Sequence, residues 1–346
     1  MNTKIDIRKN VKSLLDSESD KKNFITAVKG LKAEISDIKI NGSTISTYDK
    51  YVIWHAQSMG KMIDDVRNAA HSGPIFLPWH REFLRRFEKD LQRIVPGVTL
   101  PYWDWTEDSS RPESSPIWSS DFLGGNGDSR YTHPSLDFTP NPDMGFVVRT
   151  GPFKYDPNDQ NSWNVPVIDD MGKPVFRQDG SLRRDPLLRW FELRSFLKYP
   201  TSQDVESAKE VATYDRSDWF QHANDNNPSF RNAIEGWRQT NVVELHNAIH
   251  VYVWGTMQFG ISPGDPVFFL NHSNVDRLWA EWQVGKNSDD NYPPDGSITY
   301  PDGTPIPANN RAYKMFPWNN DKEGNPTVES VLDHHKLGYM FDLETK

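Results

Sequence analysis

The chain has 346 residues, a formal net charge of −9 and no cysteine. The absence of cysteine excludes a disulfide scaffold, an iron–sulfur cluster, a thiolate zinc site and a catalytic thiol. The acidic balance argues against nucleic acid as a partner, since that partner requires a basic face. No stretch approaches the ~18 apolar residues of a membrane span, and residues 1–8 lack the apolar run of a signal peptide. We expect a cytoplasmic enzyme with no membrane partner, although a partner protein could still export it.

The N-terminal part of the chain has the apolar spacing of helices. Residues 20–35 place an apolar stripe on a charged helix. A second helix is predicted to begin after the Ser46–Thr47 pair, either member of which can cap it, and to run past His55. A third helix is predicted to begin at Pro78 and to carry His80 on its apolar face.

Long turn-rich segments separate the predicted helices. Pro, Gly, Ser, Asp and Asn dominate residues 106–164, and no second hydrophobic core is apparent there, so we predict one domain over 1–346 with this segment as a loop excursion. Residues 165–168 and 174–176 are predicted to form a hairpin. Further helices are predicted over 229–237, 242–254 and 266–282. The expected fold class is mainly α, with long loops and a few short strands.

Several histidines lie on predicted inward faces. His246 and His250 are four residues apart, so both imidazoles project from one helical face and can reach one metal ion. Asn247 stands where a zincin needs its general-base Glu, which excludes that chemistry. His272 lies near Phe268 on another predicted helix. A neutral imidazole packed among aromatic rings needs a partner for each ring nitrogen, and a metal supplies one.

The N-terminal half adds three more histidines: His55, His71 and His80. Each alone could be a hydrogen-bonded core residue, but together the chain offers two sets of three imidazoles. All-imidazole ligation suits copper or zinc, whereas di-iron bundles need several carboxylates. The spacing favours copper but does not place the two metals together. A structural protein with many core histidines is the alternative that copper analysis would test.

Four stretches of the chain closely resemble the tyrosinases, which are proteins with a coupled dinuclear (type 3) copper centre. They are residues 71–81 (His-Ser-Gly-Pro-Ile-Phe-Leu-Pro-Trp-His-Arg), 101–105 (Pro-Tyr-Trp-Asp-Trp), 246–250 and 265–279. The resemblance implies a four-helix bundle that holds two copper ions between its helices, with O2 as co-substrate. The ligands it implies are His55, His71 and His80 for the first copper, CuA, and His246, His250 and His272 for the second, CuB.

The resemblance also implies a reaction, in which O2 is used to ortho-hydroxylate monophenols and to oxidise o-diphenols to o-quinones. The expected substrates are small phenols such as tyrosine, tyramine and catechols. In the family, a Glu and the Asn after the first CuB histidine hold a water that helps to deprotonate the monophenol. Asn247 matches that Asn directly. Glu235 is the best match for the Glu, although its spacing to His246 is a few residues longer than usual.

Departures from the family pattern bear on the pocket. A chain without cysteine cannot form the thioether that ties the second CuA histidine to a Cys in some members. Val251 stands where some bacterial members have Arg, which predicts a more apolar and open pocket. Asn271 stands where His is usual. Because neighbouring helical residues project about 100° apart, Asn271 and His272 do not serve one copper, and we expect Asn271 beside the ligands or, with Phe268, in the pocket wall. The chain ends just after the family's core, so we expect no shielding domain and activity without processing.

Two other functions fit the same copper motifs. One is a catechol or o-aminophenol oxidase with little monophenolase activity. The other is an oxygen carrier like the hemocyanins, for which covering domains would be expected. The resemblance also allows for a copper-delivery protein and for a homo-oligomer. Four histidines fall outside the motifs and are expected to be solvated or structural: His133, His222, His334 and His335.

Overall fold

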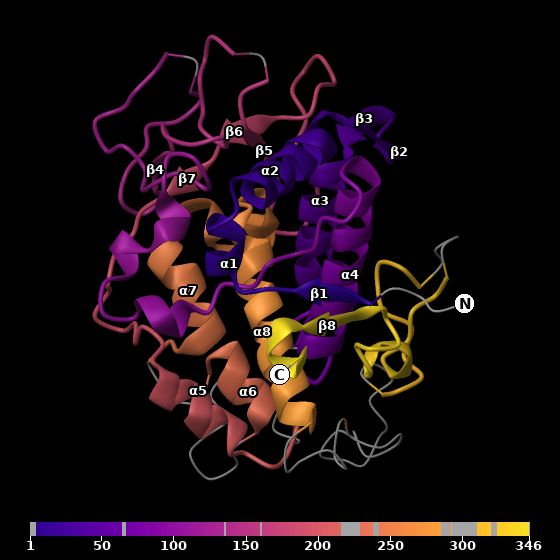
Figure 1. Ribbon diagram of the computed structural model, residues 1–346. Helices are drawn as coiled ribbons and strands as arrows, with labels where there is room; N and C mark the ends of the chain where they lie inside the picture. Colours follow the sequence, from indigo (N-terminus) through magenta and orange to yellow (C-terminus); the bar gives the residue numbers. More distant parts are fainter. Residues whose placement is uncertain are drawn as a thin grey trace.

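The computed structural model describes residues 5–63, 67–134, 136–159, 161–215, 229–237, 242–284, 292, 310–319 and 324–345. Within these ranges the chain is mainly helical, with a few short strands, as the sequence predicts (Figure 1). The α-helices are α1 (Val11–Leu15), α2 (Glu18–Ala33), α3 (Thr47–Gly60), α4 (Phe76–Ile94), α5 (Ser202–Lys209), α6 (Phe230–Glu235), α7 (Leu245–Val253) and α8 (Val267–Val284).

The described strands form four separate pairs rather than one continuous sheet. The strands are β1 (Asp6–Arg8), β2 (Ile35–Ile40), β3 (Ser43–Ser46), β4 (Phe146–Val147), β5 (Asn164–Pro166), β6 (Arg184–Pro186), β7 (Leu188–Arg189) and β8 (Tyr339–Phe341). The pairs β2–β3, β4–β7 and β5–β6 are antiparallel. The pair β1–β8 is parallel and brings the two ends of the described chain side by side (Figure 1).

The first predicted helix is confirmed except in its last turn. Ser17 caps α2 by accepting the N–H of Asp20, and α2 ends before Ile35. Ile35 is 70% exposed and begins β2 instead, so the prediction of a helix through this residue was wrong. The reason is the Asn41-Gly42 turn, in which both residues have positive φ (49° and 79°). Asn-Gly is a strong local signal for a hairpin, and here it outweighs the helical spacing of Ile35.

The next two helices carry histidines and begin close to their predicted positions. The hydroxyl of Ser46 accepts the N–H of Asp49 at 3.0 Å and so caps α3. Helix α4 begins at Phe76, two residues before the predicted Pro78. Proline is tolerated there because the N–H groups of a first helical turn have no partner within the helix. His80 therefore lies in the second turn of α4, on its buried side.

Aromatic side chains join α3, α4 and α8 into one core. Tyr51 of α3 packs edge-on against Phe83 and Phe87 of α4, with ring centroids 5.3 and 5.1 Å apart. Phe87 in turn stacks on Phe269 of α8. All four rings are almost fully buried, and burial of this apolar area is the main force that holds the helices together. Helix α7 packs against α6 and α8 and completes the surroundings of the site.

The turn-rich segment 106–164 is tied to the helical body by a buried ion pair. Arg189 of β7 donates to both carboxylate oxygens of Asp265, at 2.7 and 2.8 Å, just before α8 begins. The same guanidinium donates to the carbonyls of Leu123 and Gly124, at 3.2 and 2.7 Å. A bidentate Arg–carboxylate pair fixes direction as well as distance. The long loop and the start of α8 are therefore held in one place.

The hairpin and the helices predicted in the second half of the chain are found in outline. Residues 165–168 and 174–176 do meet, through an antiparallel bridge between Ile168 and Pro174, but the regular pairing beside them is β5 with β6. The three helices predicted in the second half are α6, α7 and α8, with ends shifted by up to three residues. None of the described helices is long and apolar enough to cross a membrane.

Candidate metal centre

Three histidines from the N-terminal half converge, and we call them the first triad. His55 lies on α3, His80 on α4, and His71 on the segment between these helices. Their ring centroids lie 4.8 to 5.8 Å apart. One nitrogen of each ring lies within 4.8 Å of one nitrogen of each of the others. The sequence prediction that these three residues form one set is therefore matched by their positions.

The second triad consists of His246 and His250, one turn apart on α7, and His272 on α8. The Nε2 atom of His272 lies 3.0 Å from Nε2 of His246 and 3.4 Å from Nε2 of His250. The two triads also meet, because the rings of His80 and His272 stack with centroids 4.2 Å apart. The sequence spacing alone did not place the two sets together, and the structure does.

Backbone carbonyls fix how three of the rings are turned. The Nδ1 acceptors are the carbonyls of Gly260 for His55, Phe76 for His80 and Met257 for His250, at 2.8, 2.8 and 2.6 Å. A carbonyl can only accept, so these rings carry their proton on Nδ1 and present the Nε2 lone pair to the triad. The Nε2 atoms of His55 and His80 are buried without a hydrogen-bond partner. A buried polar atom of this kind needs a ligand, and a metal ion is one.

The protonation state of the triads suits metal binding. Burial lowers the pKa of all six histidines, to about 3 for His55 and to about 4 for His250. The imidazoles are therefore neutral near pH 7, which is the form that coordinates a metal. Six neutral imidazoles without a carboxylate ligand suit copper or zinc. The donor set fits two adjacent transition-metal ions.

A buried ion-pair network holds the segment that carries His71. Ser72 follows His71 with a φ of 62°, and its N–H donates to Glu235 Oε1 at 2.8 Å. The other oxygen of Glu235 accepts from Arg231 at 2.7 Å, and Arg231 also donates to both oxygens of Asp215 at 2.6 and 3.0 Å. Burial raises the pKa of Glu235, while the Arg231 guanidinium opposes that rise.

Sequence reasoning missed Ser72 and Arg231. Arg231 precedes Glu235 by four residues on α6, a spacing at which opposite charges meet on one helical face, so this contact was open to prediction. The contact between Ser72 and Glu235 joins residues 163 positions apart, and no local pattern announces it.

Asn247 contacts the second triad and lines the same cavity as Glu235. Its Oδ1 accepts the Nδ1–H of His246 at 2.9 Å, and its Nδ2 is buried without a partner. Gly236, with a φ of 108°, ends α6 beside α7. A Cβ atom at Gly236 would lie 2.1 Å from the carbonyl of Glu244 and 3.0 Å from Cβ of Asn247. Only glycine fits there, and its small size brings the end of α6 close to Asn247.

A cavity of about 310 Å³ adjoins both triads. Its lining includes four of the histidines and three other residues of the predicted site: His55, His71, His246, His250, Glu235, Asn247 and Val251. Val251 thus lies where the sequence places it, in the wall of the pocket. The volume falls at the lower end of ligand pockets and suits one small aromatic ring.

Asn271 and Phe268 do not line this cavity, unlike Val251. The side-chain oxygen of Asn271 accepts the indole N–H of Trp105 at 2.9 Å, and the residue is fully buried. Phe268 packs behind both triads, with its ring 4.1 Å from that of His272 and 5.1 Å from that of His55. The predicted place in the pocket wall is corrected for both residues: Phe268 packs against the rings of the ligands, and Asn271 takes the other position expected of it, beside the ligand His272, where Trp105 holds its side chain.

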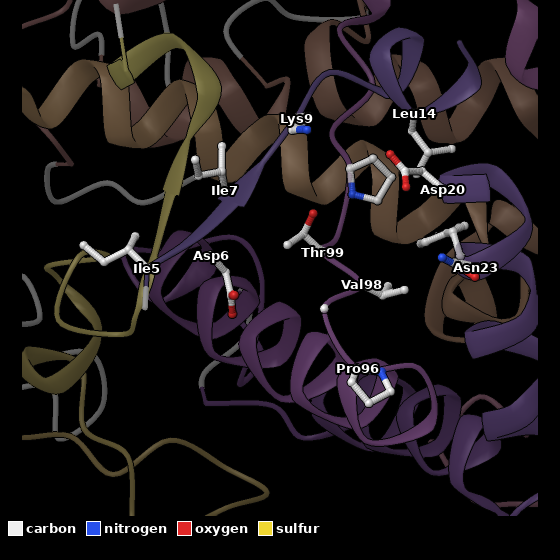
Figure 2. Close-up of a pocket in the computed structure, with 13 residues that line it drawn as sticks. Ile5, Asp6, Ile7, Lys9, Leu14, Asp20, Asn23, Pro96, Val98 and Thr99 are labelled. Carbon is white, nitrogen blue, oxygen red and sulfur yellow. The ribbon is translucent and has the colours of Figure 1, made fainter. Parts of the chain in front are cut away.

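A separate cavity of about 350 Å³ lies between β1, α2 and the segment after α4 (Figure 2). Ile5 and Ile7 border it on one side, and Asp20 and Asn23 of α2 border it on another. It shares no lining residue with the cavity at the triads and contains no histidine. Of the histidines outside the motifs, His222 lies outside the described residues.

Two imidazole triads that meet at one cavity define a protein that holds two adjacent transition-metal ions. Residues 45–285 match the family profile described as the common central domain of tyrosinase. The tyrosinase of Streptomyces antibioticus is 36% identical over 337 residues, which is 97% of this chain and 99% of that protein. Grixazone synthase of Streptomyces griseus is 34% identical over 360 residues, covering 98% of this chain and 99% of that protein. The chain therefore belongs to the tyrosinase family.

The fold is shared with solved structures. A polyphenol oxidase from Thermothelomyces thermophila superposes with a TM-score of 0.69 at 22% identity, covering 97% of this chain and 88% of that one. A functional unit of octopus hemocyanin superposes with a TM-score of 0.51 at 21% identity, covering 97% of this chain and 68% of that one. Family membership selects copper among the metals that suit the donor set, with one ion for each triad and O2 as co-substrate.

Proposed function

We propose that the chain is a tyrosinase, a copper-dependent oxidase that uses O2 to ortho-hydroxylate monophenols and to oxidise o-diphenols to o-quinones. The observation that supports it most is the convergence of the two triads on one cavity, in a chain of this family. One monophenol and one O2 give one o-quinone and one water. Two o-diphenols and one O2 give two o-quinones and two waters. When bound, the two copper ions activate O2 and accept electrons from the phenol.

The protein's own part is to orient the phenol ring and to manage its proton. Val251 gives the pocket an apolar wall, and His71 and His250 are only partly buried beside it, so a ring can approach the triads from the cavity. His80 and His272 are almost fully buried behind them. A planar ring placed this way is held close to both triads, and such orientation lowers the barrier by removing motional freedom in advance.

Asn247 and Glu235 are the residues that we assign to the phenol proton. Asn247 uses its oxygen on His246, so its free Nδ2–H is the group available to a water or to the phenol oxygen. Each oxygen of Glu235 accepts one protein hydrogen bond and keeps a second lone pair. A water that donates to Glu235 and accepts from Asn247 would take the proton of a monophenol as its ring binds.

One observation favours the second candidate, a catechol or o-aminophenol oxidase with little monophenolase activity. Glu235 is already paired with Arg231 and with the N–H of Ser72, and both contacts oppose the rise in its pKa that burial causes, so they make it a weaker base than burial alone would. Catechols lose a proton more easily than monophenols and need less help. The oxygen-carrier alternative rests on fold similarity alone, through the hemocyanin unit.

The finer structural and partner predictions belong to the same proposal. We assign α3, α4, α7 and α8 as a four-helix bundle around the copper pair, because they contribute five of the six proposed ligands. We also assign the chain as one domain over 1–346, with 106–164 as an excursion packed on it through Arg189. Small phenols are the proposed substrates. A copper-delivery protein and a homo-oligomer are proposed partners that the family resemblance allows.

Metal analysis together with a rate comparison tests the proposal. We expect two copper ions per chain and O2 uptake with tyrosine, tyramine and catechol. Copper at two per chain with turnover of catechol alone would select the second candidate. Copper binding with reversible O2 uptake and no quinone would select the oxygen carrier. Absence of copper after loading would contradict all three.

A further inference from the structure

Two adjacent histidines beside the strand β8 face one carboxylate. The Nε2 atom of His334 lies 3.0 and 3.2 Å from the two oxygens of Glu344, and Nε2 of His335 lies 2.8 Å from one of them. The two imidazole rings lie nearly side by side, with centroids 4.1 Å apart and planes tilted by 33°. The Nε2 atoms of both rings thus lie within 3.2 Å of one carboxylate.

These distances fit a shared metal ion. Zinc and similar ions bind imidazole nitrogen and carboxylate oxygen at about 2.0–2.2 Å, so two ligands of one ion lie roughly 3 Å apart. Asp333 adds a second carboxylate, 3.7 Å from Nδ1 of His335. Asp333, His334 and His335 each offer a ligand atom within 4.8 Å of the others. A carboxylate near the second ring nitrogen is the arrangement that commonly orients a metal-binding histidine.

The site is buried on one side and open on the other. The side chain of His334 is 4% exposed, and burial lowers its pKa, so the ring is neutral near pH 7 and able to coordinate. The side chains of His335 and Glu344 are 44% and 20% exposed, which leaves a route for an ion from solvent. Two imidazoles and one or two carboxylates are ligands that suit Zn²⁺.

We propose that His334, His335 and Glu344 form a further metal site, separate from the two triads, for one Zn²⁺ ion. The ion would link the 3₁₀ helix Asp342–Thr345, which follows β8, to the turn at 334–338, which precedes it. Its role is to hold β8 against β1. The proposal does not rest on phenol oxidation, since none of its ligands contributes to the cavity at the triads.

Zinc titration of the copper-loaded protein is the first test. Calorimetry should show one Zn²⁺ bound per chain, with copper content unchanged by elemental analysis. His335→Ala and Glu344→Gln should each weaken Zn²⁺ binding by about tenfold or more. His133→Ala removes a histidine outside the site and should bind like the unaltered chain. Zn²⁺ binding that is absent, or is equally tight in His335→Ala, would overturn the proposal and leave an ordinary His–Glu contact.

Hydrogen exchange tests the tie to β8. With Zn²⁺ in hundredfold excess over its Kd, the Tm should rise by about 4 °C. The amides of Tyr339–Phe341 should exchange more slowly with Zn²⁺ and not change in His335→Ala. Tight Zn²⁺ binding without any change at these amides would overturn the role assigned to the ion. Zn²⁺ taken up by triads that lack copper would not depend on His335, so the part of the response lost in His335→Ala tests this site even if the triads fail to load copper.

Discussion

The two triads each present three imidazoles, but they are built differently. The second triad takes all of its members from helices, with His246 and His250 one turn apart on α7. The first triad takes His71 from a segment outside any helix, and Nδ1 of His71 has no hydrogen-bond partner. A helix fixes its side chains through its own backbone bonds, whereas His71 depends on contacts made elsewhere. The geometry of the first triad should therefore be more sensitive to substitutions at distant residues.

Those distant contacts come from the neighbourhood of the second triad. Ser72 is held by Glu235, which ends α6, and the carbonyl of Glu235 also lies 3.3 Å from Nδ1 of His246. The same residue thus touches the supports of both triads. The comparison of the triads shows how a ligand outside a helix can be held in position. Here the buried carboxylate of Glu235 binds the backbone N–H of Ser72, next to His71.

The largest expected effect is the loss of a ligand, which should affect the two triads alike. His80→Ala and His250→Ala each remove one of three imidazoles, so copper affinity should fall by more than about a hundredfold, which is the upper end for loss of an outer partner. Phenol and catechol turnover should both disappear. Elemental analysis and O2 uptake measure this, and His133→Ala should retain both copper ions. A fully copper-loaded His250→Ala would show that the second triad is assigned wrongly.

Glu235→Gln should weaken copper binding at the first triad more than at the second. The change leaves Arg231 with Asp215 as its remaining carboxylate and weakens the hold on Ser72, at a cost of about 2 kcal/mol in the free energy of unfolding. Copper should leave the first triad more readily than the second during chelator titration. Glu329→Gln alters an exposed carboxylate paired with Arg311 and serves as the control. Equal release from both triads would contradict the indirect support of His71.

Asn247→Asp should act on the substrate rather than on the metal. Aspartate keeps an oxygen for the Nδ1–H of His246 but lacks the free amide donor, so both copper ions should stay bound. Monophenol turnover should fall by about tenfold or more while catechol turnover changes little, since a positioned proton acceptor contributes at least that much. Asn247→Leu removes both contacts and should also lower copper affinity. Equal loss on both substrates in Asn247→Asp would indicate a purely structural role.

Substitution of Asn271 should produce the smallest effect, and its comparison with substitution of His272 shows which of the two neighbours is the ligand. Asn271→Ala removes the acceptor of the Trp105 indole and should cost about 1–2 kcal/mol of stability with both copper ions retained. His272→Ala should empty the second triad. Asn271→His should keep both copper ions and shift the pH profile of turnover, because imidazole titrates near neutral pH. Denaturant unfolding and metal analysis measure these changes, and copper loss in Asn271→Ala would reverse the assignment.

The ligands were predictable from sequence, whereas their supports mostly were not. The helical spacing of His246 and His250 predicts that both can bind one metal ion, and the resemblance to tyrosinases identifies the other four histidines as ligands. Contacts between segments far apart in the sequence, such as that of Ser72 with Glu235, cannot be predicted from a local sequence pattern. Asn271 was expected either beside the ligands or in the pocket wall, and its hydrogen bond to Trp105, 166 residues away in sequence, holds it outside the wall.

The fold was predictable where one signal dominates. The helices that carry His55 and His80 were found by apolar spacing and caps. At Ile35 two signals compete, and the Asn41-Gly42 turn decides for a strand because its positive φ values suit a hairpin. The anchoring of 106–164 through Arg189 depends on a buried charge pair with Asp265, which composition does not reveal.

The parallel pairing of β1 with β8 has a mechanical consequence. Tension that draws β1 back past Asp6 and β8 onward past Phe341 pulls the two strands in opposite directions along one axis. All the hydrogen bonds of the pair then share the force at once, in shear, instead of opening one after another. Arg8 adds a cross-link, since its buried guanidinium binds Glu88 of α4 at 2.7 Å and Asp276 of α8 at 2.9 Å. The region that joins the two ends of the described chain is thus arranged as a clamp against stretching.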